Sequence, residues 1–292
     1  MKKIKIPKII FLLLLAFLLP LATKAQAPIS ISRHANLSIF SGYYAKRQNA
    51  HNNGYWIGAY GDLPIYRSLS ERWNLGFWGL YVHSKWTDNL NCYTSSSNDF
   101  AVGLNTGYYE ELFSNTHSFF AGLAIGYKNS RETGKVEKKK YFSSSQQLDH
   151  SLVANLNLNL MKVSGYHPRL FPRTQLTLSC QLSFDSQKNL SENGLTNTEV
   201  EPWNKGNYEA MLKQSIVDIP LNSSESFFLQ PKIGVQYSHY LAGDPNAYAW
   251  TIEMAFHKAA TDDFLSLSLM QKFYPGKDYL FLMVNINILK LK

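Results

Sequence analysis

The chain has 292 residues, of which 45% are hydrophobic and 17% are charged, and its formal net charge is +8. Five of its 29 basic residues are lysines within the first 27 positions, where there is no acid, so 24 basic and 21 acidic residues remain. This near balance gives no reason to invoke nucleic acid as a partner. Two cysteines, Cys92 and Cys180, are too few for a disulfide framework, and we expect two free thiols.

A secretory signal peptide is predicted over residues 1–27. Lysines precede an apolar run at residues 9–21, and Ala25-Gln26-Ala27 then forms a small-x-small cleavage site. This run is too short for a transmembrane helix, which needs roughly 20 apolar residues. The remaining residues, 28–292, contain no linker, low-complexity tract or shift in composition, so we expect them to form one domain.

Twelve β-strands are predicted after this segment, because apolar and polar residues alternate with a period of two along each of them. They cover residues 36–45, 54–63, 73–85, 99–109, 117–128, 148–162, 173–186, 207–219, 226–241, 248–259, 263–274 and 278–289. Residues 151–161 show the alternation most clearly. Pro231 lies in the middle of a predicted strand, where it predicts a β-bulge.

The apolar faces of these strands are predicted to point outward. The polar face of residues 151–161 carries Asn155, Asn157 and Asn159, which are small and uncharged and suit a crowded, wet interior. The alternative is a soluble β-protein with its leucine rows packed inward, but a barrel of that kind would need an unusually wide apolar core. In the outward register, Gln214 faces the apolar surroundings.

The connections between the predicted strands alternate in length. Long polar connections follow odd-numbered strands, at residues 86–98, 129–147 and 187–206. Shorter turns mostly follow even-numbered strands, at residues 64–72, 110–116, 220–225 and 260–262. An even number of antiparallel strands with this asymmetry places both termini at the end of the barrel that carries the short turns.

With the signal peptide and with aromatic residues near several strand ends, residues 28–292 resemble Gram-negative outer-membrane β-barrel proteins over nearly their full length. The resemblance implies an all-β fold, an antiparallel up-and-down transmembrane β-barrel of about 12 strands. It also implies that the protein lies in the outer membrane with both termini periplasmic. Outer-membrane lipids, lipopolysaccharide and the barrel assembly machinery are then the expected partners.

Two functions from different classes are open. Polar inner rows and twelve strands favour a passive or weakly selective channel for small hydrophilic solutes, with at most a narrow pore. The alternative is a non-conducting structural, adhesive or accessory barrel that acts through its extracellular loops. Small inner residues at mid-height would favour the channel and interlocking large ones the alternative. The sequence contains both a small set, Gly103, Asn105, Gly122, Ala124 and Ser266, and a large set, Trp56, Tyr60, Met283, Glu253 and Lys213.

A lipid-modifying enzyme at the barrel rim is the third possibility, and the sequence argues against it. Outer-membrane lipid hydrolases resemble one another in a His-x-Ser arrangement. Here each His–Ser pair is adjacent, as at His83-Ser84, so its two side chains point to opposite faces of a strand. The eight histidines are scattered and show no zinc-binding spacing. We therefore expect no enzymatic activity, no metal and no cofactor.

The candidates for lining the bore are Lys213, Lys232, Glu253 and His257. The strand parity turns the first three inward, near mid-height on neighbouring strands. We expect Lys232 to pair with Glu253 and to leave Lys213 as a fixed positive charge. That charge either gives a pore an anion preference or belongs to a salt-bridged network that braces the wall.

A basic outer loop is predicted at residues 128–140. Besides Lys128 it carries Arg131, Lys135, Lys138, Lys139 and Lys140, against Glu132 and Glu137. One interpretation is a solvated loop. The other is that these side chains bind phosphates of lipopolysaccharide or draw anionic solutes toward the barrel mouth.

Overall fold

The computed structural model describes residues 35–46, 52–68, 70–88, 92–112, 116–138, 141–162, 169–192, 195–200, 206–222, 227–240, 247–258, 265–274 and 277–291. The predicted signal peptide lies outside these ranges. Every regular element within them is a β-strand. Across the described ranges, no helix is long and apolar enough to cross a membrane.

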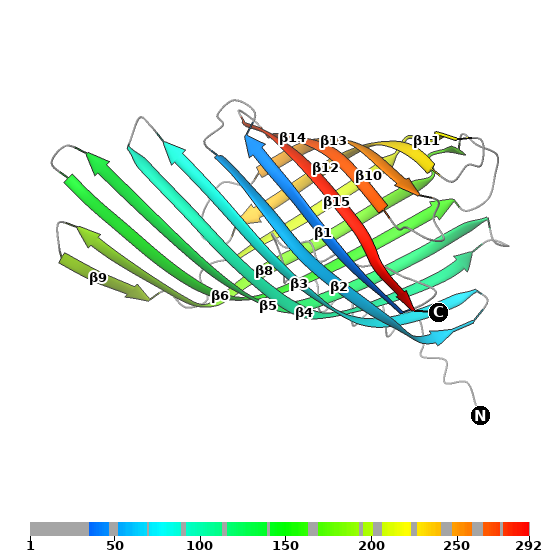
Figure 1. Cartoon of the computed structure of the whole chain (residues 1–292), viewed down its shortest axis with the longest axis horizontal. Coiled ribbons are helices and arrows are strands. Elements are labelled where there is room, and N and C mark those ends of the chain that lie inside the picture. The colour runs from blue at the N-terminus through cyan, green and yellow to red at the C-terminus, as the bar shows by residue number, and fades with distance from the viewer. Residues whose placement is uncertain are drawn as a thin grey trace.

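The strands form one continuous wall (Figure 1). Their bounds are β1 (Ala35–Lys46), β2 (Asn52–Arg67), β3 (Glu71–Asp88), β4 (Tyr93–Leu112), β5 (His117–Lys138), β6 (Tyr141–Lys162), β7 (Arg169–Leu170), β8 (Arg173–Glu192), β9 (Leu195–Val200), β10 (Gly206–Ser215), β11 (Val217–Pro220), β12 (Phe227–Tyr240), β13 (Ala247–Lys258), β14 (Leu265–Tyr274) and β15 (Lys277–Leu291).

The predicted twelve-stranded antiparallel barrel is confirmed. Each of its strands pairs with its neighbours in the sequence, in the order β10-β8-β6-β5-β4-β3-β2-β1-β15-β14-β13-β12, and pairing of β12 with β10 closes the ring. Ala35 at the start of β1 pairs with Leu291 at the end of β15, so the first and last strands adjoin. The short strands β7, β9 and β11 are additions to this ring. Every strand of the main barrel therefore has a neighbour on both sides, although β8 and β10 share a single backbone pairing.

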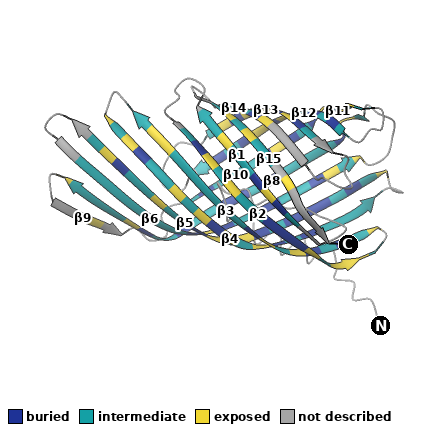
Figure 2. Ribbon diagram, viewed as in Figure 1, coloured by how far each residue is buried: buried dark blue, intermediate teal, exposed yellow. Residues whose placement is uncertain are grey.

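The apolar faces point outward, as predicted. Along β6, Leu152 and Leu160 are exposed by 42% and 43%, whereas Ser151 and Asn155 are 0% and 3% exposed. The same alternation recurs around the wall as neighbouring bands of exposed and buried residues (Figure 2). The alternative with leucine rows packed inward is therefore wrong. Cys92 is exposed and Cys180 buried, and both thiols are free, as expected.

The prediction of three long outer loops was wrong, because strands occupy most of these residues. β5 runs on to Lys138 and β6 begins at Tyr141, and β3 and β4 likewise continue to Asp88 and from Tyr93. Part of the third predicted loop belongs to the β8–β9 hairpin. The polar composition predicted loops, but the ladder is made by backbone groups, and polar side chains can pair across it. Ser96 and Thr133, for example, share a hydrogen bond of 3.0 Å.

The extended hairpins form a wall on one side of the barrel, at the end away from the chain termini (Figure 1). β5 and β6 have 22 residues each. At about 3.3 Å per residue and a tilt of about 45°, such a strand rises about 50 Å, roughly twice the height of a membrane's apolar band. We call residues 129–138 and 141–150, with their continuation into β4, β8 and β9, the extended wall.

A β-bulge is present near Pro231, as predicted, but the extra residue is in the neighbouring strand. β12 pairs regularly with β13 through Pro231 and Met254. On its other side, Ser215 pairs with Lys232 while Ile219 pairs with Leu229, so the β10–β11 segment holds one extra residue. The missing proline N–H faces this gap between β10 and β11, where the Ile216 N–H donates to the Pro231 carbonyl at 2.9 Å.

Candidate functional site

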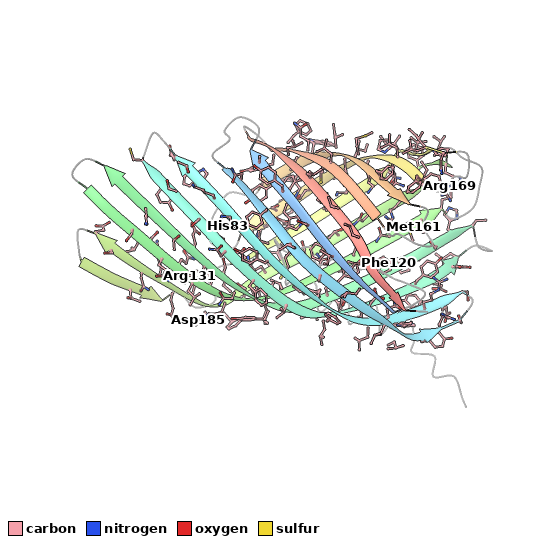
Figure 3. The ribbon with its side chains drawn as sticks, in the orientation of Figure 1. His83, Phe120, Arg131, Met161, Arg169 and Asp185 are labelled. Atoms are coloured by element: carbon pink, nitrogen blue, oxygen red, sulfur yellow. The ribbon has the colours of Figure 1, made fainter. Side chains whose placement is uncertain are left out.

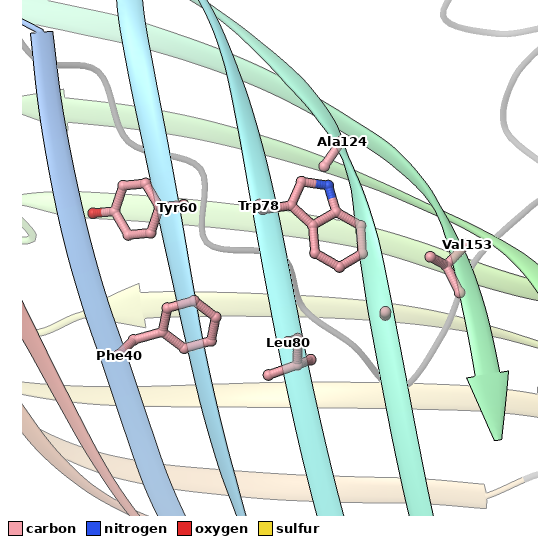
Figure 4. Packing of buried hydrophobic residues seen from close by; sticks show 7 residues of the cluster. Phe40, Tyr60, Trp78, Leu80, Ala124 and Val153 are labelled. Atoms are coloured by element: carbon pink, nitrogen blue, oxygen red, sulfur yellow. The ribbon is translucent and has the colours of Figure 1, made fainter. Parts of the chain in front are cut away.

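Large side chains fill one part of the bore. Phe40, Tyr60 and Trp78, from β1, β2 and β3, are only 9%, 4% and 3% exposed. They form a buried cluster with Leu80, Ala101, Ala124 and Val153. Figure 4 shows the rings of Phe40 and Tyr60 beside each other and Trp78 directed toward Ala124. We call Phe40, Tyr60 and Trp78 the aromatic layer.

The rings are seated on glycines of the adjacent strands. Trp78 lies opposite Gly103, which in turn lies opposite Gly126. A Cβ atom at these glycines would come within 2.8 Å and 2.5 Å of the Trp78 indole. Phe40 covers Gly58 in the same way. Gly103, one of the small residues that would favour an open bore, is therefore covered by a large ring.

A charged network occupies the opposite side of the bore. The Lys213 Nζ lies 2.6 Å from one carboxylate oxygen of Glu253, and the Lys232 Nζ lies 2.9 Å from the other. Lys213 and Glu253 are 8% and 5% exposed. The expected Lys232–Glu253 pair is present, but Lys213 is not left as an unpaired charge, because Glu253 accepts from both lysines.

Further charged groups surround this network. Lys272 of β14 places its ammonium 5.0 Å from the centroid of the Phe281 ring and interacts electrostatically with Glu209, Lys213 and Glu253. Arg173 of β8 interacts electrostatically with Lys232. We call Lys213, Lys232, Lys272 and Arg173, with Glu253 and Glu209, the basic cluster. Its four cations exceed its two acids, so the interior here carries an excess of positive charge.

Two buried hydroxyl groups adjoin the basic cluster. Ser215 and Thr251 are 1% and 2% exposed, and neither side-chain oxygen has a hydrogen-bond partner among the described residues. Ser215 lies directly opposite Lys232, and Thr251 directly opposite Lys272, so each hydroxyl shares a face with a lysine. Buried polar groups usually find partners, and these two point into a positively charged interior.

Only part of the predicted basic loop can be followed in the structure. Lys128 is buried and its ammonium lies 2.7 Å from Asp99, so it belongs to the bore. Arg131 and Lys135 are exposed, four residues apart on β5, and Figure 3 shows Arg131 on the extended wall. The side chain of Lys138, and the whole of Lys139 and Lys140, lie outside the described residues. Arg131 and Lys135 are thus strand residues, and their phosphate-binding role stays a prediction.

His257 is in β13, where it pairs with Phe228, but its side chain is outside the described part of the chain. The pore-lining role of the four predicted residues stays a prediction. Among the described residues, no group of three His, Cys, Asp or Glu side chains could hold a metal ion. Trp78 and Phe40 were not predicted from the sequence, although the inward-facing glycines opposite each ring indicated that a large side chain could pack there.

No protein family and no curated protein matches the chain. Two solved structures resemble it over most of their length. The beta domain of the Bordetella autotransporter BrkA has a TM-score of 0.51 at 10% identity and covers 87% of this chain and 98% of its own. The translocator domain of the autotransporter NalP from Neisseria meningitidis has a TM-score of 0.55 at 9% identity, and the match covers 86% of this chain and 88% of that domain. The chain has the fold of an outer-membrane β-barrel. An outer membrane channel from Pseudomonas putida F1 is also similar, with a TM-score of 0.48 at 7% identity over 91% of this chain and 99% of its own.

Proposed function

We propose that the protein is an outer-membrane β-barrel whose bore is closed to free diffusion and which acts at the cell surface through its extended wall. The observation that carries this proposal is the filled bore. In an open pore the inward side chains are exposed to water. Here Trp78, Tyr60 and Glu253 point inward and are almost fully buried. This burial favours the non-conducting alternative over the channel.

The outer surface supports a location in a membrane. Large apolar side chains are exposed around the wall, including Leu104 at 65%, Trp250 at 69% and Ile252 at 51%. Water would leave this belt unfavourably solvated, whereas lipid covers it without cost. Barrels of this class place long hairpins outside the cell, so the adjoining ends of β1 and β15 would be periplasmic.

The extended wall supports a surface role. It carries a ladder of polar cross-strand contacts, such as Ser95 to Glu132 at 3.1 Å, which hold it as a sheet above the apolar belt. Arg131 and Lys135 lie on one face of it, where lipopolysaccharide phosphates would be accessible partners. The expectation of no enzymatic activity stays a prediction.

Planar-bilayer conductance tests the closed bore. We expect the wild-type barrel to show no steady single-channel current. The double variant Phe40→Ala/Trp78→Ala removes two rings of the aromatic layer and should give measurable current. Phe77→Ala/Phe100→Ala is the matched control, because Phe77 and Phe100 point outward and are 56% and 53% exposed; it should stay silent. Steady conductance in the wild-type protein would overturn the proposal.

A further inference from the structure

One joint of the barrel has almost no backbone ladder. β8 and β10 share a single pairing, Gly206 with Leu182, whereas β10 pairs with β12 at nine positions. Residues 174–182 and 206–214 are all described, so this contrast does not come from missing segments. We call this joint between β8 and β10 the seam.

Hydrogen bonds of side chains join β8 and β10 at the end of the seam that contains Thr174 and Gln214. Continuing the register of Gly206 and Leu182 places Thr174 opposite Gln214. The Thr174 hydroxyl donates to the Gln214 Oε1 at 2.7 Å, and the Gln214 Nε2 donates to the Arg173 carbonyl at 3.1 Å. Gln214 is on the outward face, as predicted, between the exposed Leu212 and Ile216. Its amide is used within the seam, which explains a glutamine on the apolar face.

The part of the basic cluster on β8 and β10 lies directly behind the seam. Lys213 and Ser215 flank Gln214 on β10 and point inward, and Arg173 adjoins Thr174 on β8. Asp218, a further buried acid in β11, is already bound by Arg169 at 3.3 Å. An uncompensated positive charge is costly in a buried site, and an anion there would relieve it.

We propose that the basic cluster binds the phosphate group of an anionic lipid, which reaches it from the side through the seam. A phosphate accepts charge-assisted hydrogen bonds from lysines and hydrogen bonds from hydroxyl donors. The unpartnered Ser215 hydroxyl, on the strand that borders the seam, supplies the second kind of donor. The acyl chains would pass between β8 and β10 into the surrounding apolar phase. Opening this joint breaks one backbone pairing, the hydrogen bonds of Gln214 and the packing between two strands that lie side by side, whereas β10 and β12 are also joined by nine backbone pairings.

Binding is measured by calorimetry on the whole barrel in a non-ionic detergent. The probes are dioctanoyl phosphatidic acid, inorganic phosphate, and dioctanoylglycerol as the phosphate-free control. We expect phosphatidic acid to bind at least tenfold more tightly than inorganic phosphate and dioctanoylglycerol not to bind. Equal affinity for the two phosphate compounds would overturn the lipid as the source of the phosphate. Failure of both to bind would overturn the site itself.

Variants locate the site. Lys213→Gln and Lys232→Gln should each weaken phosphatidic acid binding at least tenfold, because each removes one ammonium and leaves Glu253 paired with the other. Lys85→Gln is the matched control, since Lys85 is exposed on the outer part of β3. Migration of unheated samples on gels verifies that each variant has folded. Unchanged affinity in both cluster variants would overturn the assignment.

A cross-link tests the route. Thr174→Cys/Gln214→Cys, in a background with Cys92→Ser and Cys180→Ala, places two thiols opposite each other across the seam. Oxidation should slow phosphatidic acid binding, and reduction should restore the rate. Equal lipid binding in the oxidised and reduced barrels would overturn lateral entry. None of these measurements depends on whether the bore conducts.

Discussion

Lys213 pairs with Glu253 across an intervening strand, because β12 lies between β10 and β13. Gly234 of β12 stands at the crossing point: it lies opposite Lys213 on one side and opposite Thr251 on the other. A side chain at this position would occupy the space that the Lys213 stem crosses. The pairing therefore depends on a glycine as much as on the two charges.

Gly234→Ala should destabilise the barrel. Its Cβ would come within 2.9 Å of the Lys213 Cγ and 2.7 Å of the Leu212 carbonyl oxygen. Overpacking of this kind costs about 1–3 kcal/mol, which urea unfolding monitored by tryptophan fluorescence would detect. Gly79→Ala is the matched control, because a Cβ there meets its neighbours only at 3.8 Å and 3.9 Å. Equal stability of the two variants would contradict the packing described for Gly234.

Glu253→Gln should destabilise the barrel more strongly. It leaves two buried lysines without their shared carboxylate, and breaking a buried ion pair costs about 3–5 kcal/mol. The double variant Lys213→Met/Glu253→Gln removes one of the stranded charges and should recover part of that loss. A double-mutant cycle from urea unfolding measures the coupling, and purely additive effects would show that Lys213 and Glu253 do not interact.

Leu158→Arg should block or slow membrane assembly, because Leu158 belongs to the outward row of β6. A cation near the middle of the lipid costs about 2–4 kcal/mol. Asn157→Arg should be tolerated better, since Asn157 belongs to the inward row and accepts a hydrogen bond of 2.8 Å from Asn159. The fraction of barrel that migrates in the folded position on unheated gels measures both. The same damage from either change would mean that the assigned facing of β6 is incorrect.

Gln214→Leu should loosen the seam. It removes the hydrogen bonds to Thr174 and to the Arg173 carbonyl, a loss of about 1–3 kcal/mol. Hydrogen exchange followed by mass spectrometry should show residues 174–182 and 206–214 exchanging roughly tenfold faster or more, which corresponds to about 1.4 kcal/mol or more. Residues 151–161 of β6 serve as the internal reference and should be unchanged. Uniform acceleration over the whole barrel would indicate global destabilisation.

The strand count and the facing of the strands could be predicted because a period of two is a local property. Leu152 and Asn155 fall on opposite faces whatever their neighbours are. The extended wall could not be recognised from polarity, because residues such as Ser96 and Thr133 suit a loop and a solvated hairpin equally well.

The chemistry of the interior was less accessible to sequence reasoning. Parity placed Lys213, Lys232 and Glu253 on the inner face, but it gives no distance between strands that are not neighbours. The Lys213–Glu253 contact therefore depended on the three-dimensional arrangement. The role of Gln214 could not be predicted either, because its partners Thr174 and Arg173 lie across the seam, where β8 and β10 share only one backbone pairing.

The pairing of β1 with β15 governs when the barrel can form. Ala35 meets Leu291, whereas every other contact in the ring joins strands that follow closely in the chain. Hairpins between strands that follow one another can form locally, but the ring cannot be completed before the first and last strands meet. Joining ends so distant in sequence adds a slow step. Until that step, the edges of β1 and β15 are open to wrong partners, and a factor that holds them would act at this stage.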